Sequence, residues 1–141
     1  MARALLTRRV TFTALHRYRL PQWNDEHNRL VFGACAQQDF HQHQYTCDVT
    51  VGGEIDHTTG FVVDLEDLDD VINEVVLVRF DKKNINRDVP EFEEGRLVPS
   101  GENLARFIYE RMEEALGDRG NMAQVRLAED DTLWATYNGG G

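Results

Sequence analysis

Residues 41–55 read HQHQYTCDVTVGGEI, and their side chains alternate with a period of two over most of this stretch. Strict alternation of this kind is typical of a strand that buries one of its two faces. One parity carries His41, His43, Tyr45, Cys47, Val49 and Val51. The other parity is polar and carries Gln42, Gln44, Thr46, Asp48 and Thr50. We therefore expect a long strand with two histidines near its start.

The segments on either side of this stretch extend the pattern. Residues 10–18, VTFTALHRY, alternate in the same way and predict a second strand, with His16 near its end on the side of Val10 and Phe12. After the 41–55 strand, DHTTG at 56–60 predicts a turn and FVVD at 61–64 a short return strand, so that 41–64 forms a hairpin. The polar residues 19–28 predict a loop.

Helical spacing replaces alternation further along the chain. An apolar stripe from Leu65 to Val76 predicts one helix, with Asp64 as its N-terminal cap. Residues 84–99 predict a long irregular connection. A second stripe from Leu104 to Leu116 predicts another helix, which Ser100 can cap and which stops before Gly117.

The chain closes with two predicted strands around Asp130 and Asp131. The order strand, strand, helix, helix, strand, strand predicts a single α+β domain over residues 1–141, with an antiparallel sheet of four or five strands and two helices. Because two helices leave the sheet edges open, we also expect copies of the chain to assemble.

Composition limits the partners. At 141 residues the chain is long enough for one domain with its own core. Its net charge of −10 argues against nucleic acid and anionic membranes as partners, because both attract basic surfaces. The two cysteines are too few for a disulfide scaffold, and no apolar run approaches the roughly 18–20 residues of a membrane span. We expect a cytoplasmic protein.

Three histidines form a candidate metal site. His41 and His43 lie two residues apart on one strand, so their side chains point the same way and are roughly 7 Å apart. His16 occupies the apolar side of a strand that could pair with theirs. Three neutral imidazoles around an open position are the ligand set of a catalytic zinc ion. The alternative is that these histidines are hydrogen-bonded residues of the core or surface.

The two cysteines differ in their surroundings. Cys35 precedes a polar stretch, and a partly exposed thiol beside a metal or cation can act as a base or nucleophile. Cys47 alternates with Tyr45 and Val49, which is typical of a small buried hydrophobic residue.

Several blocks of the sequence together resemble one family. FTALH, FGAC, HQHQY, GEID followed by TGFVVDLEDL, FDKKNIN with DVPEF, SGENLARFIYERM and VRLAED occur in the order found in the 6-pyruvoyltetrahydropterin synthase family. The resemblance covers roughly residues 8–138 and extends to the 6-carboxytetrahydropterin synthases of the queuosine pathway. The five residues between Cys35 and His41 are more similar to the pyruvoyl-forming branch.

The resemblance implies the tunnelling fold and a zinc enzyme. In that fold a four-stranded antiparallel sheet carries two helices on one face, three subunits close a barrel, and two trimers stack as a homohexamer with active sites between subunits. The matching motifs imply that His16, His41 and His43 bind Zn²⁺. They also imply that Cys35 is the base that abstracts a proton, in a triad with Asp81 and the residue after it.

The resemblance also implies a pterin pocket. Glu129 would bind the amino group and ring nitrogens of the pterin with its carboxylate, a bidentate fit. Ser100 and Glu102 match the stretch that lines this pocket. Without the resemblance, Ser100 is a helix cap and Glu129 a charge at a strand end.

Two positions depart from the family pattern. Gln42 replaces a glycine between the two histidines, but its opposite parity lets it point away from the metal site. Lys82 replaces the histidine of the triad, although Asp81 before it is kept. A lysine has an ordinary pKa of about 10.4 and is a poor proton shuttle near neutral pH. It could instead be a fixed positive charge near the thiol or a substrate phosphate, or a solvated surface residue.

The resemblance therefore implies a zinc-dependent lyase that converts 7,8-dihydroneopterin triphosphate to 6-pyruvoyltetrahydropterin with elimination of triphosphate. One alternative is a 6-carboxytetrahydropterin synthase or another enzyme that cleaves the pterin side chain. A second alternative is a homologue that binds pterin or metal without catalysis, because Lys82 leaves the triad incomplete.

Overall fold

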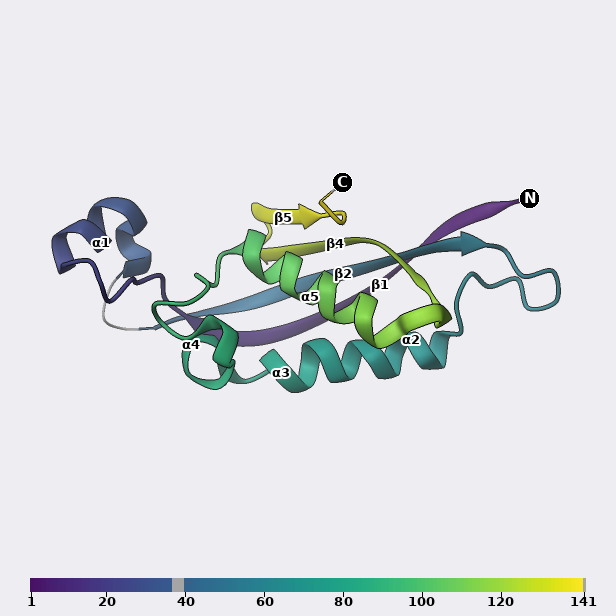
Figure 1. Cartoon of the computed structure of the whole chain (residues 1–141), viewed down its shortest axis with the longest axis horizontal. Coiled ribbons are helices and arrows are strands. Elements are labelled where there is room, and N and C mark those ends of the chain that lie inside the picture. Colours follow the sequence, from purple (N-terminus) through teal and green to yellow (C-terminus); the bar gives the residue numbers. More distant parts are fainter. Residues whose placement is uncertain (37–39, 141) are drawn as a thin grey trace.

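Two long strands form the centre of the structure. The computed structural model describes residues 1–36 and 40–140, and the side chain of Cys35 lies outside the described part. Strands β1 (Arg3–His16) and β2 (His41–Glu54) are antiparallel, in an unbroken register from Arg3 opposite Glu54 to His16 opposite His41. Both run along the length of the molecule in Figure 1. The alternation at 10–18 and 41–55 therefore predicted the central pair correctly, although β1 begins earlier than expected.

The sheet has five strands in the order β3-β1-β2-β4-β5, which is within the range predicted from the sequence pattern but one more than the four that the resemblance implied. Strands β4 (Asn121–Asp130) and β5 (Leu133–Tyr137) extend it on the side of β2. The additional strand, β3 (Lys83–Asn84), is parallel to β1. It forms because the chain turns onto the free edge of β1, where Asp81 Oδ1 accepts the Thr13 N–H at 3.1 Å and the Lys82 N–H donates to the Thr13 carbonyl at 2.6 Å.

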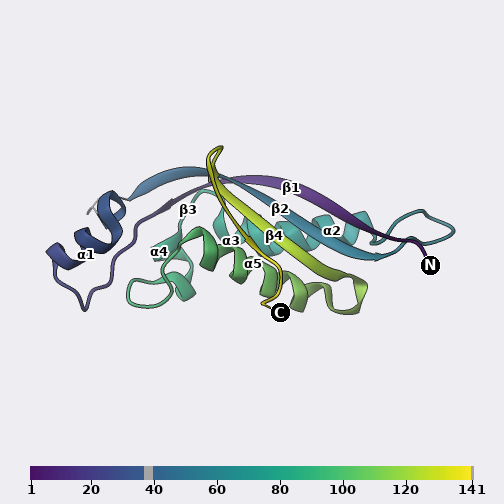
Figure 2. The ribbon, with the colours of Figure 1, turned by 90° about the horizontal axis from the view of Figure 1, so that it is seen from above.

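Both predicted helices are confirmed. The first continues as α2 (Leu65–Ile72), a π-helical turn (Asn73–Leu77) and α3 (Val78–Phe80). The second is α5 (Gly101–Leu116). The caps are those expected, since Asp64 Oδ1 accepts the Asp67 N–H at 3.0 Å and Ser100 Oγ accepts the Asn103 N–H at 3.2 Å. In Figure 2 the strands lie along one side and these helices along the other.

The core fills the space between the sheet and these helices. The rings of Phe12 and Tyr45 stack across the two central strands with centroids 4.9 Å apart. Phe80 packs against Phe12 and Phe107, which joins the sheet to both helices. Fully buried helix residues complete the core, among them Leu68, Ile72, Leu104, Ile108 and Met112. The core covers one face of the sheet, so side chains of that parity at the end of β1 and the start of β2 lie on the same face as the core.

Three local predictions were wrong. Residues 61–64 form no strand, because this segment leads directly into the capped start of α2. Helix α1 (Asp25–Phe32) begins within the predicted loop at 19–28, after its N-cap Asn24, whose Oδ1 accepts the His27 N–H at 2.8 Å. The predicted irregular connection contains α4 (Ile85–Asp88) and a 3₁₀ turn (Pro90–Phe92). Further 3₁₀ turns follow α1 (Gly33–Ala36) and α5 (Gly117–Arg119).

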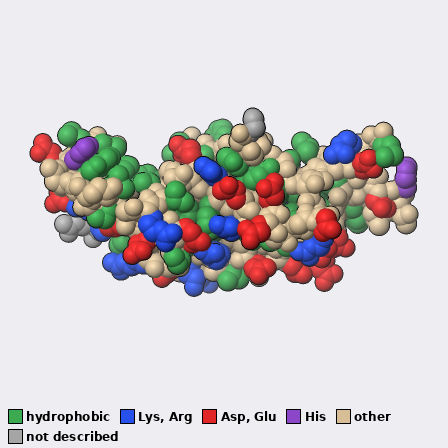
Figure 3. Space-filling view, viewed as in Figure 1, with side chains coloured by type: hydrophobic (Ala, Val, Ile, Leu, Met, Phe, Trp, Pro, Cys, Tyr) green, Lys and Arg blue, Asp and Glu red, His purple; other side chains and the backbone are tan. Residues whose placement is uncertain are grey.

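The surface is charged and mixed on the face that the helices cover. In Figure 3, acidic and basic side chains are interspersed over this face. Helix α1 projects at one end of the molecule and the N-terminus lies at the other (Figure 1). Among the helices that the structure describes, none has the length and apolar character needed to cross a membrane.

Candidate active site

An imidazole pair lies where β1 ends and β2 begins. The strand register places His16 directly opposite His41 and His43 opposite Ala14, so all three histidines share the helix-covered face of the sheet. The His16 and His43 rings are 4.7 Å apart between centroids. His16 is fully buried. Strand β1 ends here because the next amide, Arg17 N–H, donates to Asn86 Oδ1 at 2.9 Å.

These two imidazoles have nitrogen atoms without partners. Among the described residues, the buried side-chain polar atoms that lack a hydrogen bond are His16 Nε2 and His43 Nε2. An orphaned buried polar atom costs stability unless something binds it. Two such atoms on neighbouring rings therefore indicate a site for a ligand.

Tyr45 orients the His16 ring through its Nδ1, the nitrogen opposite the unpartnered Nε2. Its hydroxyl forms a hydrogen bond of 2.7 Å with His16 Nδ1, and both residues are fully buried. If Nδ1 carries the ring proton and donates it to the hydroxyl oxygen, the lone pair remains on Nε2. Burial, reinforced by the neighbouring His43 and His41 and opposed by the Pro99 carbonyl, lowers the pKa of His16 to about 3. His16 is thus a neutral imidazole at physiological pH, which is the form that binds a metal ion.

The donor set fits two ligands of a zinc site. Neutral imidazole nitrogens suit Zn²⁺, and a second hydrogen bond such as that from Tyr45 typically fixes the ligand's tautomer. A catalytic zinc ion takes three protein ligands. In the described part of the chain, no group of three or more His, Cys, Asp or Glu side chains is arranged to hold a metal ion. The His16 and His43 rings lie together, and His41 lies directly opposite His16 in the strand register.

A second feature, the Glu129 cavity, lies beside the end of β4 and the start of α5. It has a volume of about 270 Å³. Three residues predicted to bind pterin, Ser100, Glu102 and Glu129, line it together. Ser100 also caps α5, so the two interpretations of this residue are compatible. The other described lining residues are Tyr18, Gly101, Leu127, Leu133, Trp134 and Ala135.

Tyr18 connects this cavity to the imidazole pair. Its hydroxyl donates to Glu129 Oε1 at 2.8 Å, and its ring lies 4.8 Å from the His16 ring. Sequence reasoning did not select Tyr18. The available signal was an aromatic residue with a polar tip two positions after a candidate ligand.

Asp81 and Lys82 lie at the opposite edge of the sheet. They precede β3, whereas Glu129 is in β4, three strands away in the sheet order and therefore roughly 14 Å away at the usual strand spacing. Asp81 binds the Thr13 amide, and Lys82 is exposed with a left-handed backbone (φ 61°). Neither is among the described residues that line the Glu129 cavity.

The two cysteines can be compared only in part. The predicted base, Cys35, has its backbone in the Gly33–Ala36 turn, and its side chain lies outside the described part of the structure. Cys47 is buried and unpaired, as expected for a small core residue. Burial raises the pKa of the Cys47 thiol to about 12, with a smaller contribution from Asp48.

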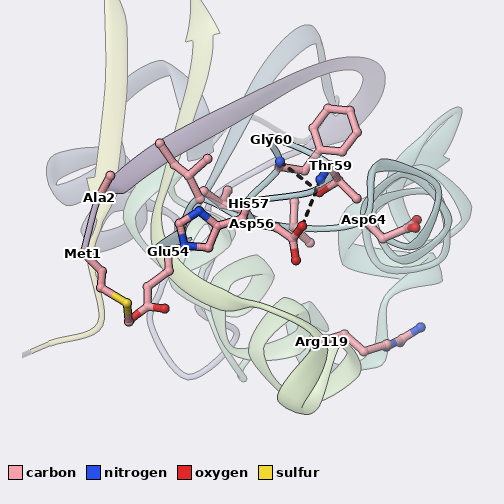
Figure 4. A pocket seen from close by; sticks show the side chains of 13 residues that line it. Met1, Ala2, Glu54, Asp56, His57, Thr59, Gly60, Asp64 and Arg119 are labelled. Carbon is pink, nitrogen blue, oxygen red and sulfur yellow. Dashed lines mark hydrogen bonds between the residues drawn. The ribbon is translucent and has the colours of Figure 1, made fainter.

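A larger hollow of about 840 Å³ lies far from these residues. It is formed by the N-terminus, the end of β2, the loop that follows it and Arg119. Figure 4 shows His57 beside Glu54 in this hollow, and Asp56 turned toward its own loop, where it accepts the Thr59 N–H at 2.9 Å. None of the predicted site residues is among its described lining. The described residues that were predicted to bind pterin or metal therefore lie at the Glu129 cavity and around the imidazole pair, and none lines the larger hollow.

Comparisons with known proteins identify the family of the chain. Residues 5–140 match the family model described as 6-pyruvoyl tetrahydropterin synthase. The chain is 38% identical over 134 residues to the 6-pyruvoyl tetrahydrobiopterin synthase of Poecilia reticulata, covering 95% of this chain and 89% of the relative. It is 36% identical over 136 residues to the human 6-pyruvoyl tetrahydrobiopterin synthase, covering 96% of this chain and 92% of the relative.

Comparison with solved structures points to the same family. The structure of Caenorhabditis elegans 6-pyruvoyl tetrahydropterin synthase superimposes with a TM-score of 0.92 at 29% identity, covering 99% of this chain and 97% of that one. The Plasmodium vivax 6-pyruvoyl tetrahydropterin synthase shares the fold, with a TM-score of 0.64 at 16% identity over 97% of this chain and 98% of that one. The chain belongs to the 6-pyruvoyl tetrahydropterin synthase family, and so to a family of lyases.

Proposed function

We propose that the protein is a zinc-dependent lyase that converts 7,8-dihydroneopterin triphosphate to 6-pyruvoyltetrahydropterin and releases triphosphate. The observation that carries this proposal is the position of two unpartnered imidazole nitrogens beside a cavity that contains a carboxylate. Tyr18 contacts His16 and Glu129, which supports the interpretation of the two features as one site. Relatives named as 6-pyruvoyl tetrahydrobiopterin synthases support the choice of substrate.

In this proposal His16 and His43 hold the zinc ion, and His41 joins them when the ion binds. Zinc would supply Lewis-acid polarisation of the substrate's side-chain oxygens, which acidifies the neighbouring carbon-bound hydrogens. The buried Tyr45 hydroxyl holds the His16 ring in one orientation. The neutral state of His16 leaves the imidazole free to bind without first losing a proton.

Glu129 binds the pterin. The amino and ring N–H groups along one edge of a pterin can donate two parallel hydrogen bonds to a carboxylate. The cavity of about 270 Å³ is slightly below the roughly 300–1,000 Å³ of most ligand sites, so it accommodates the ring system rather than the whole substrate. The side chain and its phosphates then extend past the imidazole pair.

Proton transfer is assigned to Cys35 by the resemblance, with Asp81 and Lys82 from a second copy of the chain. This arrangement is supported by the positions of Asp81 and Lys82, which are not among the described residues that line the Glu129 cavity and precede a strand three places away from β4 in the sheet order. A homohexamer with sites between subunits would combine them. Light scattering of the purified protein tests this assembly, and a monomeric protein with full turnover would contradict it.

The test of the function is product analysis by mass spectrometry after incubation of the zinc-loaded protein with dihydroneopterin triphosphate. The proposal predicts triphosphate and a pyruvoyl product. A carboxylated or side-chain-cleaved pterin would support the alternative enzymes instead. Pterin binding without any turnover, together with a gain of turnover in Lys82→His, would support a non-catalytic homologue.

A further inference from the structure

Tyr18 is placed where three parts of the site meet. Its hydroxyl donates to Glu129 Oε1 at 2.8 Å, and its ring is 4.8 Å from that of His16. On another side the ring meets Phe32 edge to face, with centroids 5.9 Å apart. Phe32 is the last residue of α1, and the Gly33–Ala36 turn that contains Cys35 follows it directly.

We propose that Tyr18 is the positioning residue of this site, with its hydroxyl orienting the Glu129 carboxylate toward the pterin and its ring fixing the spacing between that carboxylate and the imidazole pair. This inference rests on the function proposed above. It adds a role that the motifs did not indicate, because Tyr18 lies beyond the end of β1 and contacts a residue on β4.

The hydroxyl is suited to orient the carboxylate without blocking it. An ionised carboxylate offers about four lone-pair positions, so Oε1 can accept from Tyr18 and still accept from a ligand. Glu129 is only partly buried, and its side chain would otherwise sample several rotamers. Because a carboxylate held in one rotamer loses less conformational entropy on binding, removal of the hydroxyl should weaken pterin binding.

The ring is suited to fix distances. It fills the space between His16 and Phe32, two residues that belong to separate elements. Phenylalanine would preserve this packing, whereas leucine would not reach both rings. Since displacement of reacting groups by about 1 Å can cost roughly 100-fold in rate, loss of the ring should reduce turnover itself.

The first experiment measures neopterin binding to the metal-free protein by isothermal titration calorimetry. Tyr18→Phe should raise the Kd for neopterin about 2–10-fold, because the Glu129 side chain would then lose its rotamer freedom only when the ligand binds. Tyr109→Phe is the matched control, because the Tyr109 hydroxyl donates to the Met122 carbonyl at 3.2 Å in another part of the sheet. Its Kd should equal that of the native protein.

The second experiment compares steady-state kinetics with dihydroneopterin triphosphate on the zinc-loaded protein. Tyr18→Phe should raise KM and keep kcat within about threefold, whereas Tyr18→Leu should lower kcat at least tenfold. Native-like neopterin binding by Tyr18→Phe would overturn the role of the hydroxyl and leave the proposed function intact. Equal kcat values in the two variants would overturn the role of the ring. A native protein that neither binds neopterin nor turns over substrate would overturn the proposed function together with this inference.

Discussion

Substitution of Tyr45 by phenylalanine tests the hydrogen bond between the Tyr45 hydroxyl and His16 Nδ1. The ring that stacks on Phe12 is retained, so burial of apolar surface is nearly unchanged. The change removes the 2.7 Å bond from Tyr45 to His16 Nδ1 and leaves that nitrogen buried without this partner. A buried polar atom left unsatisfied costs about 1–3 kcal/mol. At this chain length each kcal/mol corresponds to roughly 3 °C, so the melting temperature should fall by about 3–9 °C.

The same substitution should weaken zinc binding. Loss of the outer hydrogen bond of a histidine ligand typically reduces metal affinity about 10–100-fold. Differential scanning calorimetry of the metal-free protein measures the first effect, and competition with a chromophoric chelator measures the second. Tyr109→Phe is again the control, because it removes a longer bond to a carbonyl and should cost about 1 kcal/mol or less with unchanged zinc affinity. If Tyr45→Phe matched this control in both measurements, the assignment of His16 as an oriented ligand would be refuted.

Three further outcomes test other parts of the structure. Cys47 has a pKa raised to about 12 by burial, so mass spectrometry should find it unmodified by iodoacetamide at pH 8 until the protein is denatured. Asp48 has a lowered pKa, chiefly through its hydrogen bonds from Arg9. Its ionised form therefore stabilises the fold above the unfolded pKa of about 3.9, and this stability is lost as pH falls through the folded pKa. Urea titrations should accordingly show Asp48→Asn less stable by about 1 kcal/mol at pH 7, with the difference closing in acid. Lys82 has a left-handed backbone, a conformation that glycine adopts at lower cost than lysine. Lys82→Gly should therefore raise the free energy of unfolding by about 0.5–1 kcal/mol in urea titrations. A loss of stability would show instead that the lysine side chain has a structural role.

The sequence was informative where a local pattern matched the tertiary environment. Strands β1 and β2 alternate because one face packs on helices, and α5 carries an apolar stripe for the same reason. Helix α1 was missed because its residues are mostly polar and exposed. Asn24 before it and Gly33 after it were available signals, since the first caps the helix and the second ends it with φ 61°.

Other features depend on contacts between distant segments. Strand β3 has two residues, and pairing with β1 rather than any local preference creates it. The motifs grouped Glu129 with Ser100 and Glu102, but the link through Tyr18 depends on how the end of β1 approaches β4. Likewise, no local pattern indicated that Lys82 precedes a strand that lies three places away from the strand of Glu129 in the sheet order.

The central claim is that the imidazole pair and the Glu129 cavity form one zinc and pterin site. Its most direct test is a crystal structure of the protein grown with zinc and neopterin, with anomalous diffraction recorded at the zinc edge. We predict an anomalous peak bound by His16 Nε2 and His43 Nε2, with His41 as the third ligand and the pterin edge on Glu129. A peak elsewhere, or a pterin bound away from Glu129, would contradict the claim.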